Sequence, residues 1–162
     1  MTITLFVLAV LLTGQQISEP AGRQERQQGV HDRGAHVMGF DQDKTVHHFR
    51  LHPDGGSIDI AVTDGGDAAN RDAIRSHLPH IAQRFGDGNF EAPMLIHATG
   101  VPGTKRMAEL KSRLRYVYVE TAGGGRLDVF TTDADALTAV HEFMRFQIRD
   151  HGTGDTTAVT KR

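Results

Sequence analysis

The stretch TVHHFRLHPDGGSIDIAVTD, residues 45–64, determines the fold class expected for this chain. Apolar and polar residues alternate on both sides of the turn-forming segment Pro-Asp-Gly-Gly at residues 53–56, which predicts a β-hairpin. A second hairpin is predicted around the three glycines at residues 123–125, because residues 114–120 and 127–129 alternate in the same way. Shifting the sequence by 69 positions (124 − 55) superimposes GGSIDIAVTD on GGRLDVFTTD. This match indicates an internal duplication.

Each predicted hairpin is followed by a helical pattern. In the first pattern, residues 71–85, the apolar residues at helical spacing are Ile74, Leu78, Ile81 and Phe85. In the second, one face carries Leu137, His141, Met144 and Ile148, and Asp133 can cap the helix. Between the two units we expect an extended piece at residues 92–98 and a short helix at residues 104–111.

These elements predict an α+β fold with two layers. Repeat 1 (residues 45–86) and repeat 2 (residues 113–150) would each be a ββα unit, together forming a four-stranded, mainly antiparallel sheet with two helices on one face. The alternation places one set of residues toward the helices: His47, Phe49, Leu51, Ile58, Ile60, Val62, Leu127 and Val129. It places another set on the outer face: His48, Arg50, His52, Asp59, Tyr116, Tyr118, Asp128 and Phe130.

The remaining segments are interpreted from their composition. The apolar run within residues 1–14 has the length of the core of a secretory signal peptide, which predicts a periplasmic or secreted protein. An uncleaved anchor is the alternative, and it would provide the only contact with a membrane. The polar residues 15–33 are predicted to be a flexible linker, residues 34–155 a single domain, and residues 156–162 a disordered tail.

The charge and cysteine content exclude several classes of function. The 162 residues carry 18 Lys and Arg against 20 Asp and Glu, a formal charge of −2, so no nucleic-acid partner is expected. The absence of cysteine rules out disulfides, thiolate metal sites and a cysteine nucleophile. Histidine is plentiful, at ten residues. A bound metal would therefore be held by imidazole, thioether, carboxylate or backbone oxygen.

Histidines at core-facing positions are the main candidates for a functional site. His141 lies within an apolar helical stripe, where its ring needs a partner such as a metal, a carboxylate or, more commonly, a backbone carbonyl. Three more imidazoles are expected in the core: His47, His77 and His97. Together these four predict an exported binding protein for copper, zinc or haem. Four further residues are reserve ligands: His36, Met38, His48 and His80.

Two alternatives of a different kind remain open. A structural or interaction module is one, forming a homodimer through the outer sheet face or the second helix, where Phe143 and Phe146 lie off the core stripe. A hydrolase using Asp59 and Asp128 as paired carboxylates is the weaker one, since a solvated sheet face also explains these residues. A role without catalysis is favoured.

Four blocks of the sequence carry a resemblance to a known family. They are HVMGFDQDKTVHHF (residues 36–49), RDAIRSHLPHIAQRF (residues 71–85), APMLIH (residues 92–97) and HEFMRFQIRDHGTGD (residues 141–155). These blocks resemble a family of small exported bacterial proteins with no assigned activity. Its members are sometimes labelled aspartate carbamoyltransferase. The sequence does not support that label, because the chain is far too short and lacks the Ser-Thr-x-Thr-Arg loop for carbamoyl phosphate.

Overall fold

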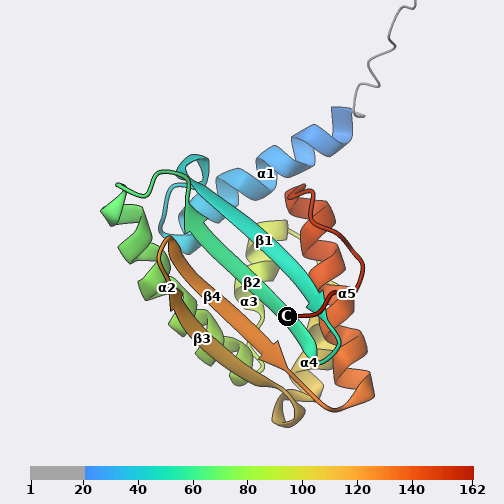
Figure 1. Cartoon of the computed structure of the whole chain (residues 1–162). Coiled ribbons are helices and arrows are strands. Elements are labelled where there is room, and N and C mark those ends of the chain that lie inside the picture. The colour runs from blue at the N-terminus through green and yellow to red at the C-terminus, as the bar shows by residue number, and fades with distance from the viewer. Residues whose placement is uncertain (1–20) are drawn as a thin grey trace, which may run out of the picture.

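The computed structural model of the protein describes residues 21–162, which form five α-helices and one antiparallel sheet. Figure 1 shows the elements, which are α1 (Ala21–Met38), β1 (Thr45–His52), β2 (Gly55–Val62), α2 (Ala68–Gly86), α3 (Glu91–His97), α4 (Thr104–Glu109), β3 (Arg115–Thr121), β4 (Gly124–Phe130) and α5 (Ala134–His151). The α+β fold predicted from the sequence is confirmed. The predicted signal peptide and residues 15–20 of the predicted linker lie outside the described residues.

The four strands lie in the order β1-β2-β4-β3, and each neighbouring pair is antiparallel. Helices cover one face of the sheet, while the other face is turned toward the viewer in Figure 1. Helix α2 packs against β2, β3 and β4, and α5 packs against β1 and β2. Both hairpins therefore have a helix following them, as the sequence predicts, whereas the duplication itself stays a prediction.

The glycines that open the two inner strands occupy equivalent, crowded positions. Gly55 begins β2 and Gly124 begins β4. A Cβ atom on Gly55 would lie 1.9 Å from the carbonyl oxygen of Val129, and one on Gly124 would lie 2.4 Å from that of Ile60. Gly55 also has a positive φ of 146°. The close approach of neighbouring strands thus requires glycine at both matched positions.

The predicted inner residues of β1, β2 and β4 are confirmed, but two residues of β3 face the opposite way from the prediction. Tyr116 and Tyr118 lie opposite Val129 and Leu127, which are buried in the core. The Tyr116 ring also contacts Phe85 of α2, with 5.9 Å between ring centroids. Tyr116 and Tyr118 therefore belong to the helix-covered face. Because side chains alternate strictly along a strand, an error of one position in the pairing of β3 reverses both assignments.

The predicted flexible linker is wrong for residues 21–33, which form most of helix α1. The helix is polar along most of its length, but Val30 is only 2% exposed. Helix α1 packs against α3 and α5, and Arg26 forms an ion pair with Asp150 of α5. Helices with a weak apolar pattern are stabilised mainly by such tertiary contacts, which the local sequence does not display. Within residues 21–162, no helix is both long and apolar enough to cross a bilayer.

The predicted disordered tail is also wrong, because residues 156–162 lie against the sheet. Thr160 donates its backbone N–H to the carbonyl of Leu51 at 2.8 Å, next to a parallel bridge between Leu51 and Val159. The guanidinium of Arg162 pairs with Asp54 and Asp128. Strand β1 is an edge strand with unpaired backbone groups, and such an edge can bind a further extended segment.

Residues 92–98 were expected to be extended, and this is wrong as well. Residues 91–97 form helix α3, which ends at Ala98 in the left-handed conformation, with a φ of 50°. A short apolar run does not distinguish a buried strand from a buried helix. Pro93 fits in the first helical turn, where its missing N–H costs no hydrogen bond. The short helix expected at residues 104–111 is confirmed by α4.

The N-cap of α5 supports a first testable prediction. The Asp133 carboxylate accepts a hydrogen bond from the backbone N–H of Ala136 at 3.0 Å. Replacing Asp133 with alanine should lower the free energy of unfolding by about 1 kcal/mol. Urea denaturation of the two proteins measures this difference. Asp135→Ala is the matched control, because the exposed Asp135–Arg106 pair should contribute only a few tenths of a kcal/mol. Equal effects of both changes would contradict the capping role.

Candidate functional site

Three of the four predicted inner ligands line one cavity between the sheet and the helices. The cavity has a volume of about 60 Å³, and its histidines are His47, His77, His97 and His151. They come from β1, α2, the end of α3 and the end of α5. The thioether residue Met38, a predicted reserve ligand, lines the same cavity. The fold therefore gathers imidazoles from four separate elements around a space that is otherwise mostly apolar.

The rings of this histidine cluster (His47, His77, His97 and His151) lie close to one another. The centroid of His151 is 5.6 Å from that of His47 and 5.0 Å from that of His97. The rings of His47 and His77 both contact Phe40, with centroid separations of 6.0 and 5.7 Å. A bond of about 2.0–2.1 Å from metal to imidazole nitrogen places ligating rings roughly 5 Å apart. The spacing of His151 from His47 and from His97 is thus close to that of imidazoles sharing one ion.

Burial keeps three rings of the cluster neutral. Burial first, and then the nearby His77 and His48, lower the pKa of His47 to about 4. Burial, followed by the influence of His80, lowers the pKa of His77 to about 4. The pKa of His151 is well below its usual value, again through burial first and then through His47 and His97. At neutral pH each ring therefore carries a nitrogen lone pair, which is the form that binds metals.

One ring nitrogen of the cluster has no partner. Among the described residues, the Nε2 atom of His47 is buried and makes no hydrogen bond. Leaving a buried polar atom unpaired costs about 1–3 kcal/mol, so such atoms are uncommon. The unpaired nitrogen of His47 marks the cavity as a site where a ligand atom would be stabilising.

His97 is held by a hydrogen-bonded network. Its Nδ1 donates to Asp150 at 2.5 Å, and Asp150 also pairs with Arg26 of α1. Its Nε2 lies 2.9 Å from Oε1 of Gln147, whose Nε2 has no partner among the described residues. A half-turn of the Gln147 amide makes Gln147 the donor and satisfies both groups. His97 then has a fixed tautomer, and its Nε2 lone pair accepts the hydrogen bond from Gln147, so the Gln147 side chain would have to move before that nitrogen could bind a ligand.

A larger hollow lies outside the cavity and shares two of its histidines. This outer hollow, of about 650 Å³, is bordered by α1, β1 and the end of α5. His47 and His151 line both spaces, so their rings separate the cavity from the outer hollow. Asp32 and Asp43 border the outer hollow as well, and Asp43 lies 3.0 Å from His31. Carboxylates at this opening favour the approach of a cation.

His141, the strongest single candidate from the sequence, does not belong to the cluster. Its Nε2 lies 2.9 Å from the carbonyl oxygen of His52 and 3.1 Å from that of Gly55, so the ring donates to the main chain at the β1–β2 turn. The structure therefore does not bring His141 to the other three predicted inner ligands. Its partner is the backbone carbonyl that the sequence analysis kept as the more common alternative.

The three reserve histidines are also outside the cavity. His48 lies beside Asp155 at 2.9 Å on the outer side, and His80 is exposed and bonded to the carbonyl of Ser76. His36 is exposed on α1. His151 is not among the residues predicted from the sequence, although a signal for it exists. Continuing the apolar stripe of α5 past Met144 and Ile148 by one helical step leads to position 151.

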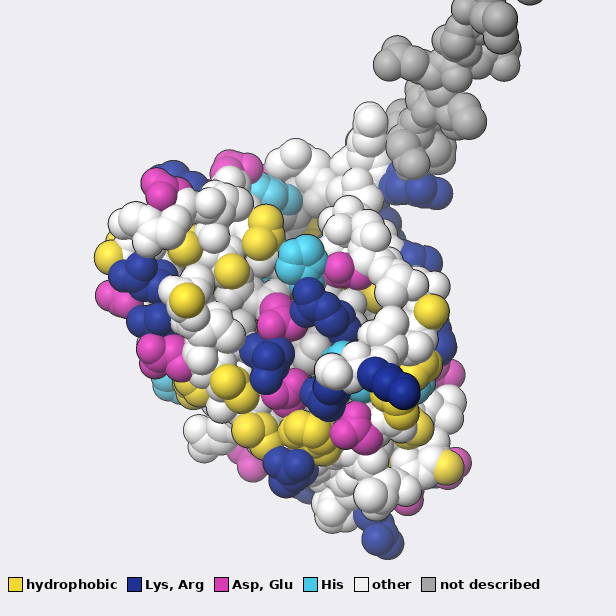
Figure 2. All heavy atoms as spheres, in the orientation of Figure 1, with side chains coloured by type: hydrophobic (Ala, Val, Ile, Leu, Met, Phe, Trp, Pro, Cys, Tyr) yellow, Lys and Arg dark blue, Asp and Glu magenta, His cyan; other side chains and the backbone are white. Residues whose placement is uncertain are grey.

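Asp59 and Asp128, the candidate catalytic pair, both lie on the outer sheet face. Asp59 forms an ion pair with Arg50, and Asp128 pairs with Arg126 at 3.1 Å and with Arg162 at 2.5 Å. Burial raises the pKa of Asp59, which Arg50 partly opposes. Figure 2 shows positive and negative side chains interspersed on this face. Each carboxylate is thus paired with a guanidinium, which fits a solvated charged face as well as a reactive pair.

Of the two phenylalanines expected on the exposed side of α5, only Phe143 is fully buried. Phe143 is 1% exposed and contacts the ring of Phe85, with 6.0 Å between centroids. Phe146 is partly buried and packs against His97, with 5.0 Å between ring centroids. The expectation of an exposed side chain is therefore wrong for Phe143. Formation of a homodimer stays a prediction.

No family model, curated protein or solved structure matches the chain. A function therefore has to be inferred from the site itself. The resemblance to a family of small exported bacterial proteins thus stays a prediction. Within residues 21–162, no three or more His, Cys, Asp or Glu side chains are already arranged so that they could hold a metal ion. The histidine cluster would have to rotate its rings to bind one.

The lowered pKa values predict a specific dependence of stability on pH. Unfolded imidazole titrates near 6.5, whereas His47 and His77 titrate near 4 in the folded chain. As the pH falls below 6.5, the unfolded chain binds protons that the folded chain does not, so stability should decrease down to about pH 4. The expected slope is on the order of 1 kcal/mol per pH unit for each ring.

Urea denaturation at pH 7, 6, 5 and 4.5 measures this slope. His47→Gln removes one of the shifted groups and should make the slope shallower. His36→Gln changes an exposed histidine of α1 and should leave the slope as it is. Identical slopes for the original protein and His47→Gln would show that His47 is not kept neutral by burial.

Proposed function

We propose that this is an exported protein that binds one copper or zinc ion in the cavity lined by the histidine cluster. The observation that carries the proposal is the convergence of four imidazoles on one small space, with the Nε2 atom of His47 buried and unpaired. His47, His97 and His151 are the first ligands in this proposal, and His77 and Met38 are the additional donors from the cavity wall. Imidazole nitrogen suits both metals.

The size of the cavity favours an ion over a haem. A volume of about 60 Å³ has room for only a few water molecules. Ligand sites for drug-sized molecules usually enclose about 300–1,000 Å³. An ion with three or four imidazoles needs little more room than the rings already surround. A haem would require the helices to separate from the sheet.

Ring rotations would complete the proposed site. His47 and His151 lie nearly parallel, at 17°, so their nitrogens need to turn toward a common point. Both rings border the outer hollow, which gives them space to turn and gives the ion a path of entry. His97 needs no such change at Nδ1, because ligating histidines commonly donate their second nitrogen to a carboxylate, as His97 does to Asp150.

Met38 favours copper over zinc. A thioether is a soft ligand that copper accepts and zinc rarely uses in proteins. Met38 is 8% exposed and lies at the end of α1, so its sulfur is sheltered from water beside the imidazoles. An exported protein would encounter copper outside the reducing environment of the cytosol. Copper(II) or copper(I) with histidine and methionine ligands is the preferred form of the proposal.

Calorimetric titration of the metal-free protein with copper(II), copper(I) and zinc(II) tests the proposal. We expect one ion per chain for copper at pH 7, with weaker binding of zinc. Affinity should decrease toward pH 4 as protons compete for the same nitrogens. The Met38→Leu variant should lose affinity for copper(I) more than for zinc. If no ion binds above the level of a denatured control, or if several ions bind weakly to exposed histidines, the proposal is wrong.

A further inference from the structure

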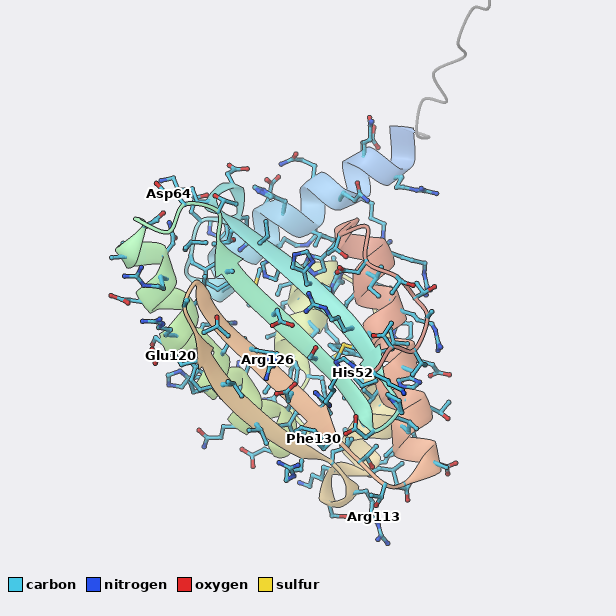
Figure 3. All side chains as sticks on the ribbon, viewed as in Figure 1. His52, Asp64, Arg113, Glu120, Arg126 and Phe130 are labelled. Atoms are coloured by element: carbon cyan, nitrogen blue, oxygen red, sulfur yellow. The ribbon has the colours of Figure 1, made fainter. Side chains whose placement is uncertain are left out.

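The outer sheet face holds a second site, on the opposite side of the sheet from the histidine cluster. A hollow of about 540 Å³ lies there between the strands and the C-terminal residues. Figure 1 shows the C-terminus in front of the sheet, over β1 and β2. Figure 3 shows His52, Arg126 and Phe130, which line this hollow, on the face toward the viewer. Its volume is that of a site for a small organic molecule.

Ser57 and His52 form a hydrogen-bonded pair at the floor of this hollow. Ser57 Oγ lies 3.1 Å from Nε2 of His52 and 3.5 Å from the carboxylate oxygen Oδ2 of Asp59. Nδ1 of His52 lies 3.0 Å from the backbone carbonyl of Thr160. A carbonyl only accepts, so Nδ1 carries the hydrogen and Nε2 carries the lone pair. The Ser57 hydroxyl therefore donates to His52.

This arrangement has the three parts of an activated nucleophile. A hydroxyl faces a basic imidazole nitrogen within hydrogen-bond distance, and a third group orients the imidazole. The third group is supplied by the C-terminal segment, which crosses the edge of β1 next to Leu51. His52 is 4% exposed and Ser57 is 2% exposed, so the pair is sheltered from bulk water. Shelter from water strengthens hydrogen bonds to a developing charge.

Cationic side chains surround the pair. Arg50 lies directly opposite Ser57 in the β1–β2 pairing, and Arg126, Lys161 and Arg162 also line the hollow. Asp59 and Asp128 offset part of this charge. The Phe130 ring lies against the guanidinium of Arg162, 4.1 Å from its Cζ atom. A hollow with four cations, two carboxylates and an aromatic wall suits a small acyl compound that carries a negative group.

We propose that Ser57 and His52 form a nucleophilic site that hydrolyses small esters carrying an anionic group. Ser57 Oγ attacks the ester carbonyl carbon while its proton passes to Nε2 of His52. The tetrahedral intermediate then expels the alkoxide, which takes that proton and leaves as the alcohol. Water, deprotonated by His52, attacks the acyl-serine and releases the carboxylic acid, and the proton returns to Ser57 Oγ. Arg50, one of whose five N–H donors binds Asp59, is placed beside the oxyanion.

Labelling with a fluorophosphonate probe tests the site directly on the full-length protein. Attack by Ser57 displaces fluoride and leaves a phosphonyl group on that residue, which peptide mass spectrometry locates. We expect labelling of Ser57, none at this position in Ser57→Ala, and labelling at least about 100-fold slower in His52→Ala. Ser76→Ala changes an exposed serine and should label as the original protein does.

Ester hydrolysis tests the substrate class. The protein should hydrolyse p-nitrophenyl hemisuccinate faster than p-nitrophenyl acetate, and Arg126→Ala should reduce that preference. Circular dichroism checks that each variant is folded. If Ser57→Ala does not fold, the position of the label on the original protein still decides. A label elsewhere, or a rate unchanged by His52→Ala, would mean that the Ser57–His52 bond is only structural.

Discussion

Replacing His47 and His151 together with alanine should lower the affinity for copper by about 100-fold or more. The two rings separate the cavity from the outer hollow, and they are the two that must turn to meet an entering ion. Their removal takes away two neutral nitrogen donors and opens the cavity to water. Replacing a residue that only hydrogen-bonds to a metal ligand commonly lowers metal affinity by about 10–100-fold, so the loss of two ligands should lower it more. Calorimetric titration of both proteins measures the difference.

The matched control removes two histidines that lie outside the cavity. His36 and His80 are both exposed, on α1 and α2, and neither lines the cavity or the outer hollow. The His36→Ala, His80→Ala double variant should bind copper within about twofold of the original protein. If this control loses as much affinity as the cavity variant, copper binds to surface imidazoles. The cavity would then have no special role.

Replacing Asp150 with alanine should lower the free energy of unfolding by about 1–3 kcal/mol. Asp150 is 7% exposed, and it joins His97 at the end of α3 to Arg26 of α1. Removing the carboxylate leaves the buried Nδ1–H of His97 without an acceptor. The loss should be larger than that from an ordinary surface pair, and it should loosen α1 in particular.

Guanidinium denaturation measures this loss, and hydrogen exchange of the α1 backbone shows where it acts. Glu142→Ala is the control, because Glu142 is exposed on the same helix and its replacement should change stability by less than about 0.5 kcal/mol. Asp150→Asn keeps the shape of the side chain and should lose less than Asp150→Ala. A loss below 1 kcal/mol for Asp150→Ala would indicate that His97 does not depend on this carboxylate.

The parts of the fold that follow from local pattern could be predicted from the sequence. Alternation around the turn at residues 53–56 located β1 and β2, and helical spacing located α2 and α5. The errors concern features set by distant contacts. The sheet face on which Tyr116 and Tyr118 lie depends on the pairing of β3 with β4. The ordered conformation of residues 156–162 depends on their contact with the edge of β1. Helix α1 likewise depends on its packing against α3 and α5.

Part of the candidate site could also be predicted from local sequence patterns. His47 follows from strand alternation, and His77 and His97 follow from their apolar surroundings. His141 satisfied the same pattern, yet its position places it beside the β1–β2 turn, where carbonyl oxygens are available. Its neighbour on the stripe, His151, lies two turns or more farther along α5 and reaches the cavity instead. Helical spacing identifies the face of α5 on which His141 and His151 lie, but it does not show which end of that face packs against the other histidines.

X-ray absorption spectroscopy of the copper-loaded protein identifies the atoms that surround the ion. We expect at least two imidazole nitrogens about 2.0 Å from copper, with the outer-shell scattering of histidine rings, and the loss of this pattern in the His47→Ala, His151→Ala variant. A first shell of oxygen atoms alone, or the same spectrum in that variant, would contradict the claim that the cavity histidines hold the ion.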